Sequence, residues 1–90
     1  MTSRLEVTHR AYKDLEKLPK EVAKRITTRL KQISGSETDP MHFAKPLTRE
    51  LKGLYRFRID DYRVVFRKDK KGNLVVLLVL RIGNRKDIYD

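Results

Sequence analysis

The chain has 90 residues, the size of one domain, and 39% of them are hydrophobic, which is enough for one small core. Its 22 lysines and arginines outnumber its 12 aspartates and glutamates, so the net charge is +10 and an anionic partner is expected. The absence of cysteine excludes disulfides and thiolate metal sites, and no apolar run approaches the roughly 20 residues that a membrane span needs. We therefore expect a single domain over residues 1–90, a cytoplasmic location and no membrane partner.

The first half of the chain is predicted to form a short strand and two helices. Leu5 and Val7 alternate with charged residues, as in a strand, and Thr8 can cap a helix that ends at Pro19. The second helix follows that proline and carries an apolar stripe at helical spacing, formed by Val22, Ile26, Leu30 and Ile33. A loop rich in glycine, serine and proline follows, and residues 47–52 are expected to form one helical turn.

The second half of the chain is predicted to form strands. Apolar and basic residues alternate from Leu54 onward, which indicates a β-hairpin that turns at Asp60 and Asp61. Residues 68–73 read as a polar turn, and residues 74–80 are all apolar, as in a strand inside a sheet. We expect an α+β domain of order β-α-α-β-β-β, with a twisted, mainly antiparallel sheet and two N-terminal helices packed on one face.

The alternation divides the hairpin into an apolar face and a basic face. The apolar face is formed by Tyr55, Phe57, Ile59, Tyr62, Val64 and Phe66, and the basic face by Arg56, Arg58, Arg63 and Arg67 around Val65. Like charges directly opposite each other destabilise a sheet, and no acidic residue is interleaved here to relieve them. Guanidinium groups bind phosphate oxygens in a bidentate manner and stay charged at physiological pH. The basic face therefore predicts a phosphodiester ligand, and the alternative is a strand face that is only solvated.

Two segments of the chain resemble the RelE/ParE family of toxins from toxin-antitoxin systems. The first, LKGLYRFRIDDYRVVF at residues 51–66, has a glycine, an alternating basic strand and a Tyr-Arg pair entering the next strand. The second, RIGNRKDIY at residues 81–89, has a Gly-x-Arg and a final tyrosine. The predicted order of elements also matches this fold along nearly the whole chain. The resemblance implies a RelE-like type II toxin that cleaves mRNA in the ribosomal A site, with no metal site and no other cofactor.

The resemblance also implies the residues of the site. In the ribosome-dependent branch of the family, basic strand residues, a further arginine and a C-terminal tyrosine surround the scissile phosphate, and the corresponding positions here are Arg56, Arg58, Arg63, Arg85 and Tyr89. Because arginine cannot accept the proton of a 2′-hydroxyl group, Tyr89 is the best candidate for the general base. Other basic residues are expected to bind RNA phosphates: Lys45, Arg49, Lys52 and Arg67, with Lys20, Lys24 and Lys31 on the second helix.

The partners implied by the resemblance are a cognate antitoxin, the ribosome and mRNA, with operator DNA bound only through the toxin-antitoxin complex. Two other functions stay open. The first is a ParE-like toxin that inhibits DNA gyrase from the same fold, although the presence of Arg63, Arg85 and Tyr89 together argues against it. The second is a non-catalytic basic module, which would bind nucleic acid in a salt-sensitive way and release no product.

Overall fold

The computed structural model of the chain describes residues 3–72 and 74–84, with Arg49 described by its backbone alone. The helices are α1 (His9–Glu16), α2 (Lys20–Gly35) and two short 3-10 helices, η1 (Pro40–Phe43) and η2 (Arg49–Leu51). The strands are β1 (Ser3–Val7), β2 (Ala44–Pro46), β3 (Tyr55–Ile59), β4 (Tyr62–Lys71) and β5 (Leu74–Asn84). Within the described ranges, no helix is long and apolar enough to cross a membrane.

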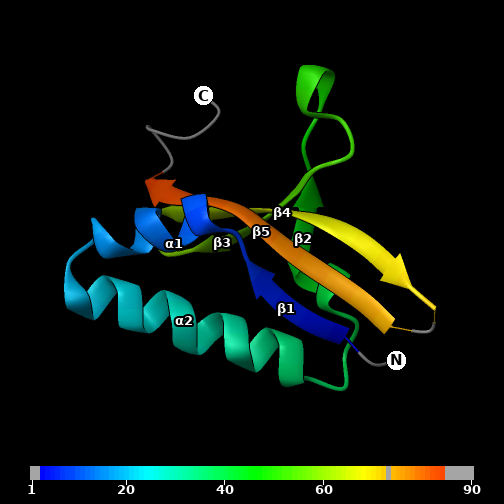
Figure 1. Ribbon diagram of the computed structural model, residues 1–90, viewed down its shortest axis with the longest axis horizontal. Helices are drawn as coiled ribbons and strands as arrows, with labels where there is room; N and C mark the ends of the chain where they lie inside the picture. The colour runs from blue at the N-terminus through cyan, green and yellow to red at the C-terminus, as the bar shows by residue number, and fades with distance from the viewer. Residues whose placement is uncertain (1–2, 73, 85–90) are drawn as a thin grey trace.

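The described strands form one sheet in the order β1-β5-β4-β3-β2 (Figure 1). β1 and β5 pair in parallel, and the other neighbours pair antiparallel. The apolar run of β5 is therefore inside the sheet, as predicted. The core lies between the helices and one face of the sheet, because buried residues of α1 and α2 cluster with the buried residues Phe57, Val64, Phe66, Val75 and Leu77. The predicted α+β architecture is confirmed.

The two helices begin where local chemistry favours it. The hydroxyl oxygen of Thr8 accepts a hydrogen bond from the Ala11 amide at 3.1 Å, which caps α1, and the same hydroxyl donates to the Leu80 carbonyl of β5 at 3.3 Å. Pro19 directly precedes α2, as the sequence predicted. The predicted apolar stripe of α2 faces the core, because Ile26 and Leu30 are only 1% and 2% exposed.

The hairpin formed by β3 and β4 has the predicted register. Ile59 lies opposite Tyr62, Arg58 opposite Arg63 and Phe57 opposite Val64. Asp60 takes the left-handed conformation in the turn, with φ of 53°, which aspartate tolerates better than most residues do. On the core face the rings of Phe57 and Phe66 stack with centroids 4.3 Å apart.

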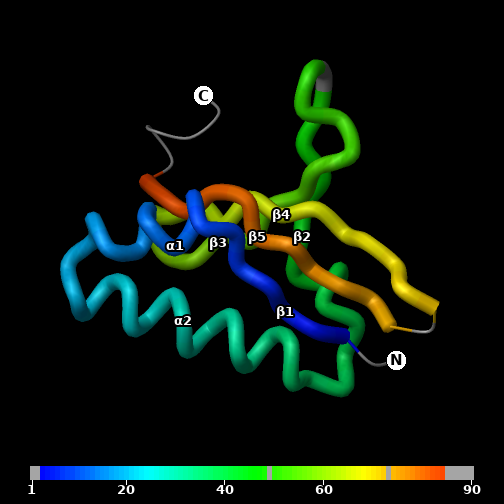
Figure 2. Tube along the Cα trace, viewed as in Figure 1, coloured from blue at the N-terminus to red at the C-terminus, as the bar shows by residue number. Residues whose placement is uncertain are grey.

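Three features differ from the expected order of elements. β4 continues to Lys71, beyond the start of the turn predicted over residues 68–73, because it pairs with β5 along its whole length. β2 is an additional short strand in the loop that precedes β3. Pro46 argued against a strand in the sequence, but a proline is compatible with an edge strand. Figure 2 shows that the segment between β2 and β3 projects away from the helices.

The third difference is a shift in the register of β4 and β5. Phe66 lies opposite Val79, but Val65 lies opposite Arg81, so Leu80 is an extra residue in β5. This arrangement is a β-bulge, which redirects the side chains on either side of it. Before the bulge Val75, Leu77 and Val79 face the core, and after it Ile82 does.

Candidate functional site

Three of the predicted site arginines lie on the face of the sheet that is turned away from the core. Side chains alternate along a strand, so the core positions of Phe57 and Val64 place Arg56, Arg58 and Arg63 on the opposite face. Arg58 and Arg63 are directly opposite each other on β3 and β4. The predicted pairing of these two arginines is therefore confirmed, and the face that carries them is called the arginine face below.

Two rows of residues cross the arginine face from strand to strand. The first row runs over three strands through Arg58, Arg63 and Gly83. The second runs over four strands through Lys45, Arg56, Val65 and Arg81. Because Gly83 has no side chain, the β5 position next to Arg63 adds no bulk to the first row. A phosphate group above this row would meet two guanidinium groups from neighbouring strands.

The arginines of this face differ in exposure. Arg58 is exposed, whereas Arg56 and Arg63 are half-buried and the Nε atom of Arg63 is inaccessible to water. Val65 lies in the middle of the second row and is 0% exposed, so it gives the face an apolar floor. Charges that are partly removed from water attract an anion more strongly than fully solvated charges do. A phosphate bound to this face would thus meet one exposed and two half-buried guanidinium groups.

Arg67, which the sequence analysis placed on the same basic face, is neutralised locally. Its Nε and Nη2 atoms donate to the two carboxylate oxygens of Asp69, at 3.2 Å and 3.3 Å. Asp69 lies two residues further along β4 and hence on the same face. The expectation of a basic face without acidic residues is therefore wrong at this end of β4, because the strand is longer than predicted. The Asp69 carboxylate offsets the charge that Arg67 would offer to RNA.

The other predicted site residues fall into two groups. Lys45 is exposed on β2 opposite Arg56, at the border of the arginine face, and Lys52 is exposed in the projecting segment between β2 and β3. Arg49 belongs to η2 in the same segment. Arg85 and Tyr89 lie outside the described residues, so their predicted roles stay predictions. Among the residues with described positions, no group of three or more His, Asp or Glu side chains is arranged to hold a metal ion.

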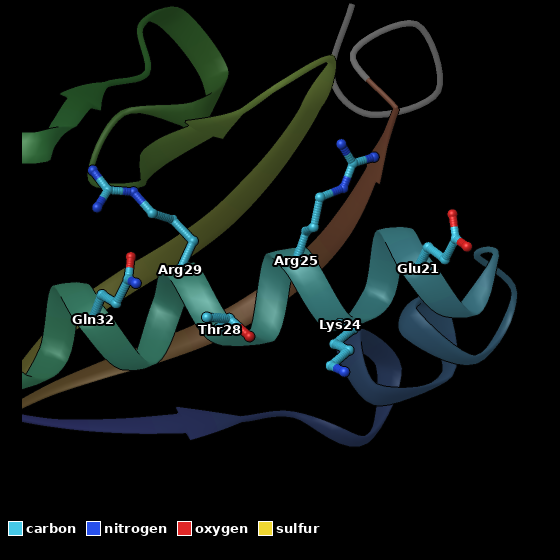
Figure 3. A pocket seen from close by; sticks show the side chains of 6 residues that line it. All are labelled: Glu21, Lys24, Arg25, Thr28, Arg29 and Gln32. Atoms are coloured by element: carbon cyan, nitrogen blue, oxygen red, sulfur yellow. The ribbon is translucent and has the colours of Figure 1, made fainter.

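A second basic surface lies on α2, on the side of the sheet opposite the arginine face. Figure 3 shows its side chains along one flank of the helix, where they line an open depression of about 630 Å³: Glu21, Lys24, Arg25, Thr28, Arg29 and Gln32. The Arg25 guanidinium lies 3.2 Å from the Asp60 carboxylate in the β3–β4 turn, and Arg29 lies 5.3 Å from the centre of the Phe43 ring. The predicted lysines Lys20, Lys24 and Lys31 are all exposed on this helix.

One residue that the sequence did not single out, Asp14, bonds to Arg81 of the second row. Asp14 of α1 is 9% exposed, and its Oδ2 atom accepts hydrogen bonds from the Arg81 Nε and the Ile82 amide, both at 2.9 Å. A lone aspartate in a helix usually faces solvent, so nothing drew attention to it. Its spacing could have indicated that it is buried, because Asp14 lies three residues after the buried Ala11 and hence on the side of the helix that faces the core.

Comparison with known proteins identifies similar chains. A family model described as the ParE toxin of the type II toxin-antitoxin system, parDE, matches residues 5–89. The chain is also 34% identical over 82 residues to the toxin RelG of Mycobacterium tuberculosis, which covers 91% of this chain and 90% of RelG.

Solved structures with a similar fold include toxins in complexes. The RelBE2 toxin-antitoxin complex of M. tuberculosis matches with 31% identity and a TM-score of 0.65, over 93% of this chain and 96% of that one. The archaeal RelE-RelB complex of Pyrococcus horikoshii matches with 26% identity and a TM-score of 0.61, over 94% and 97% of the two chains. YafQ of Escherichia coli, at 15% identity and a TM-score of 0.66 over 99% and 100% of the chains, shares the fold.

Proposed function

This chain belongs to the RelE/ParE family of type II toxin-antitoxin toxins, and from that premise we propose that it inhibits translation as a ribosome-dependent, metal-independent mRNA endoribonuclease. The observation that carries the proposal is the row formed by Arg58, Arg63 and Gly83, in which two guanidinium groups face the same side of neighbouring strands. A toxin that acts on translating ribosomes would work in the cytoplasm.

The proposed reaction is attack of a 2′-hydroxyl group on the adjacent phosphodiester. The 2′-oxygen loses its proton and forms a bond to phosphorus as the bond from phosphorus to the 5′-oxygen breaks. The leaving 5′-oxygen takes up a proton from water, so the products are a 2′,3′-cyclic phosphate and a 5′-hydroxyl end. Arg63 and Arg58 would stabilise the additional negative charge of the pentavalent phosphorane. Tyr89 would take the proton of the 2′-hydroxyl group and Arg85 would add positive charge, while Arg56 would hold the phosphate or compensate charge on the leaving oxygen.

The proposed dependence on the ribosome follows from the small number of side chains in the site that can transfer a proton. Arginine cannot take up a proton at physiological pH, so the site as proposed has one tyrosine for this work. An enzyme with weak acid-base groups gains most from a substrate that is already held in a reactive geometry. We therefore expect feeble cleavage of free RNA and efficient cleavage of mRNA held in the ribosomal A site.

The decisive experiment uses ribosomes programmed with a defined mRNA, with the ends mapped by primer extension. The wild-type protein should create new ends within the A-site codon that carry a 5′-hydroxyl, whereas Arg63→Ala should cut at least about tenfold more slowly while folding normally. Wild-type protein that binds ribosomes but creates no new ends would reject the nuclease. Equal cleavage by Arg63→Ala and the wild type would reject the proposed role of the arginine face.

The alternative function is inhibition of DNA gyrase, which is favoured by the ParE description of the matching family. A supercoiling assay run beside the ribosome assay separates the two functions, since a gyrase inhibitor stops supercoiling and leaves mRNA intact. Salt-sensitive binding of RNA with neither effect would instead identify a non-catalytic basic module.

The proposed protein partner is an antitoxin. The similar chains from M. tuberculosis and P. horikoshii were solved as complexes with their antitoxins, and the charge of +10 here suits an acidic partner that covers the arginine face. Binding of operator DNA would then belong to the toxin-antitoxin complex. Co-expression with the product of the adjacent reading frame should yield a complex that co-purifies and does not cleave mRNA, whereas a complex that cleaves as fast as the free toxin would contradict this.

A further inference from the structure

The β-bulge in β5 decides which residue lies beside Arg63. If the pairing of Phe66 with Val79 continued without the bulge, Val65 would lie opposite Leu80 and Arg63 opposite Ile82. With the bulge, Arg63 lies opposite Gly83, and Ile82 is 2% exposed in the core. A slip of one residue would exchange the two faces and place a branched side chain next to the Arg63 guanidinium. The placement of a glycine, which has no side chain, opposite Arg63 therefore depends on this bulge.

Asp14 contacts β5 directly after the bulge. β1 pairs with β5 up to the pair Val7 and Val79, so among the described strands none neighbours the next part of this edge of β5. Helix α1 runs along it instead, and Asp14 Oδ2 accepts from both the Ile82 amide and the Arg81 Nε. Two donors on consecutive residues of β5 thus share one buried carboxylate oxygen. This contact ties the bulged segment to a helix that is capped on the same strand by Thr8.

We propose that Asp14 is a positioning residue for the cleavage reaction, which holds β5 in the bulged register so that Gly83, and not Ile82, lies opposite Arg63. The inference rests on the proposed function, because it concerns the same arginine face. Asp14 does not touch the substrate in this proposal. It acts through Arg81 and Ile82 and keeps the residues opposite Arg63 in place. Such placement matters because a shift of the order of 1 Å at a reacting group can slow catalysis by about a hundredfold.

A purely structural role for Asp14 predicts something different. Loss of a buried contact lowers the fraction of folded protein, but each folded molecule keeps its rate. A positioning role lowers the rate of the folded molecules themselves. The rate constant of a single turnover at saturating enzyme separates the two roles, because it does not depend on how much of the enzyme is active.

The experiment compares Asp14→Asn and Asp14→Ala with the wild type in single-turnover cleavage of mRNA on programmed ribosomes. The side-chain oxygen of asparagine can still accept from the Ile82 amide, whereas alanine accepts nothing. We expect the saturating rate constant to fall about threefold to tenfold for Asp14→Asn and more than about tenfold for Asp14→Ala, at an unchanged half-saturating concentration. The matched control is Glu6→Gln, which removes a carboxylate paired with Arg4 on β1 and should keep the wild-type rate constant.

Amide hydrogen exchange tests the same contact without a measurement of cleavage. Asp14→Ala should speed exchange at Ile82 and Gly83 at least about tenfold and leave Val64 protected, because only the tie to α1 is lost. Wild-type rate constants in both Asp14 variants, with wild-type cleavage intact, would overturn the inference alone. An inactive wild type would reject the nuclease itself, and unchanged exchange at Ile82 in Asp14→Ala would overturn the positioning contact.

Discussion

At the scale of single residues, Arg58 and Arg63 place like charges directly opposite each other on neighbouring strands. Such a pair costs up to about 1 kcal/mol in the free energy of folding when no anion lies between the two groups. An anion that binds the folded protein removes this repulsion and raises the apparent stability by mass action. The arginine face is therefore expected to trade stability for binding, as functional sites often do.

The repulsion between the two arginines leads to a prediction for Arg58→Thr. Threonine suits a strand and removes the repulsion, so the free energy of unfolding should stay unchanged or rise by up to about 1 kcal/mol, while cleavage of ribosome-bound mRNA falls at least about tenfold. Chemical denaturation and single-turnover cleavage measure the two effects. The control is Arg67→Thr, which removes the contact with Asp69 and should give no gain in stability. A clear loss of stability in Arg58→Thr would contradict the account of the repulsion.

At the scale of elements, α1 is fixed at both ends to β5. Thr8 caps the helix and bonds to the Leu80 carbonyl, and Asp14 bonds to Ile82 on the other side of the bulge. The helix thus bridges the residue at which β5 changes register. Apolar contacts add to this attachment, since Ala11 is fully buried and Leu15 packs against the core.

The cap yields a prediction for Thr8→Ala. The substitution removes the acceptor of the Ala11 amide and the donor to Leu80, so the free energy of unfolding should fall by about 1 to 2 kcal/mol. Urea denaturation followed by circular dichroism measures the change, and Thr8→Ser, which retains both bonds, serves as the control. A loss in Thr8→Ser as large as that in Thr8→Ala would assign the effect to packing of the methyl group instead.

The elements themselves were predictable wherever one local pattern governed them. The alternation of residues 55–59 and 62–66 about the turn fixed their pairing, because the side chains on the core face must all be apolar. Capping by Thr8 and the apolar stripe of α2 are likewise local signals. The extension of β4 was not predictable in this way, since its last residues are charged and their strand conformation comes from pairing with β5.

The rest of the candidate site depends on contacts between distant segments. Asp14 and Ile82 are far apart in the sequence, and only the parallel pairing of β1 with β5 brings α1 to the end of β5. The bulge lies at Leu80, the last residue of the apolar run 74–80, and because every residue of that run is apolar, the sequence does not show which of them face the core. Asp69 was visible in the sequence, but its partnership with Arg67 required β4 to continue past the predicted turn.

At the scale of the whole molecule, positive charge lies on two opposite sides. The arginine face belongs to the sheet, and the exposed lysines of α2 point away from the core on the other side. The two surfaces cannot contact the same phosphate. On the proposed function, the arginine face would bind the reacting phosphodiester, and the α2 surface would add affinity for a larger polyanion such as ribosomal RNA.

This division predicts a separation of binding from rate. The double variant Lys20→Gln with Lys24→Gln should raise the half-saturating concentration for ribosomes, and should lower the slope of log affinity against log salt by about 0.7 for each lost phosphate contact, while the maximal rate is kept. Titration of single-turnover cleavage at several salt concentrations measures both. Lys70→Gln, an exposed lysine near the end of β4, is the control and should change neither. A fall in the maximal rate would place α2 close to the chemistry.

β5 is the last described strand of the chain, yet it lies in the interior of the sheet, where it is the partner of β1, the first. Before the ribosome has synthesised β5, β1 has no neighbour in the sheet, and Gly83 is not yet present opposite Arg63. On the proposed function, toxicity therefore requires that β5 has been synthesised and has paired with β1 and β4.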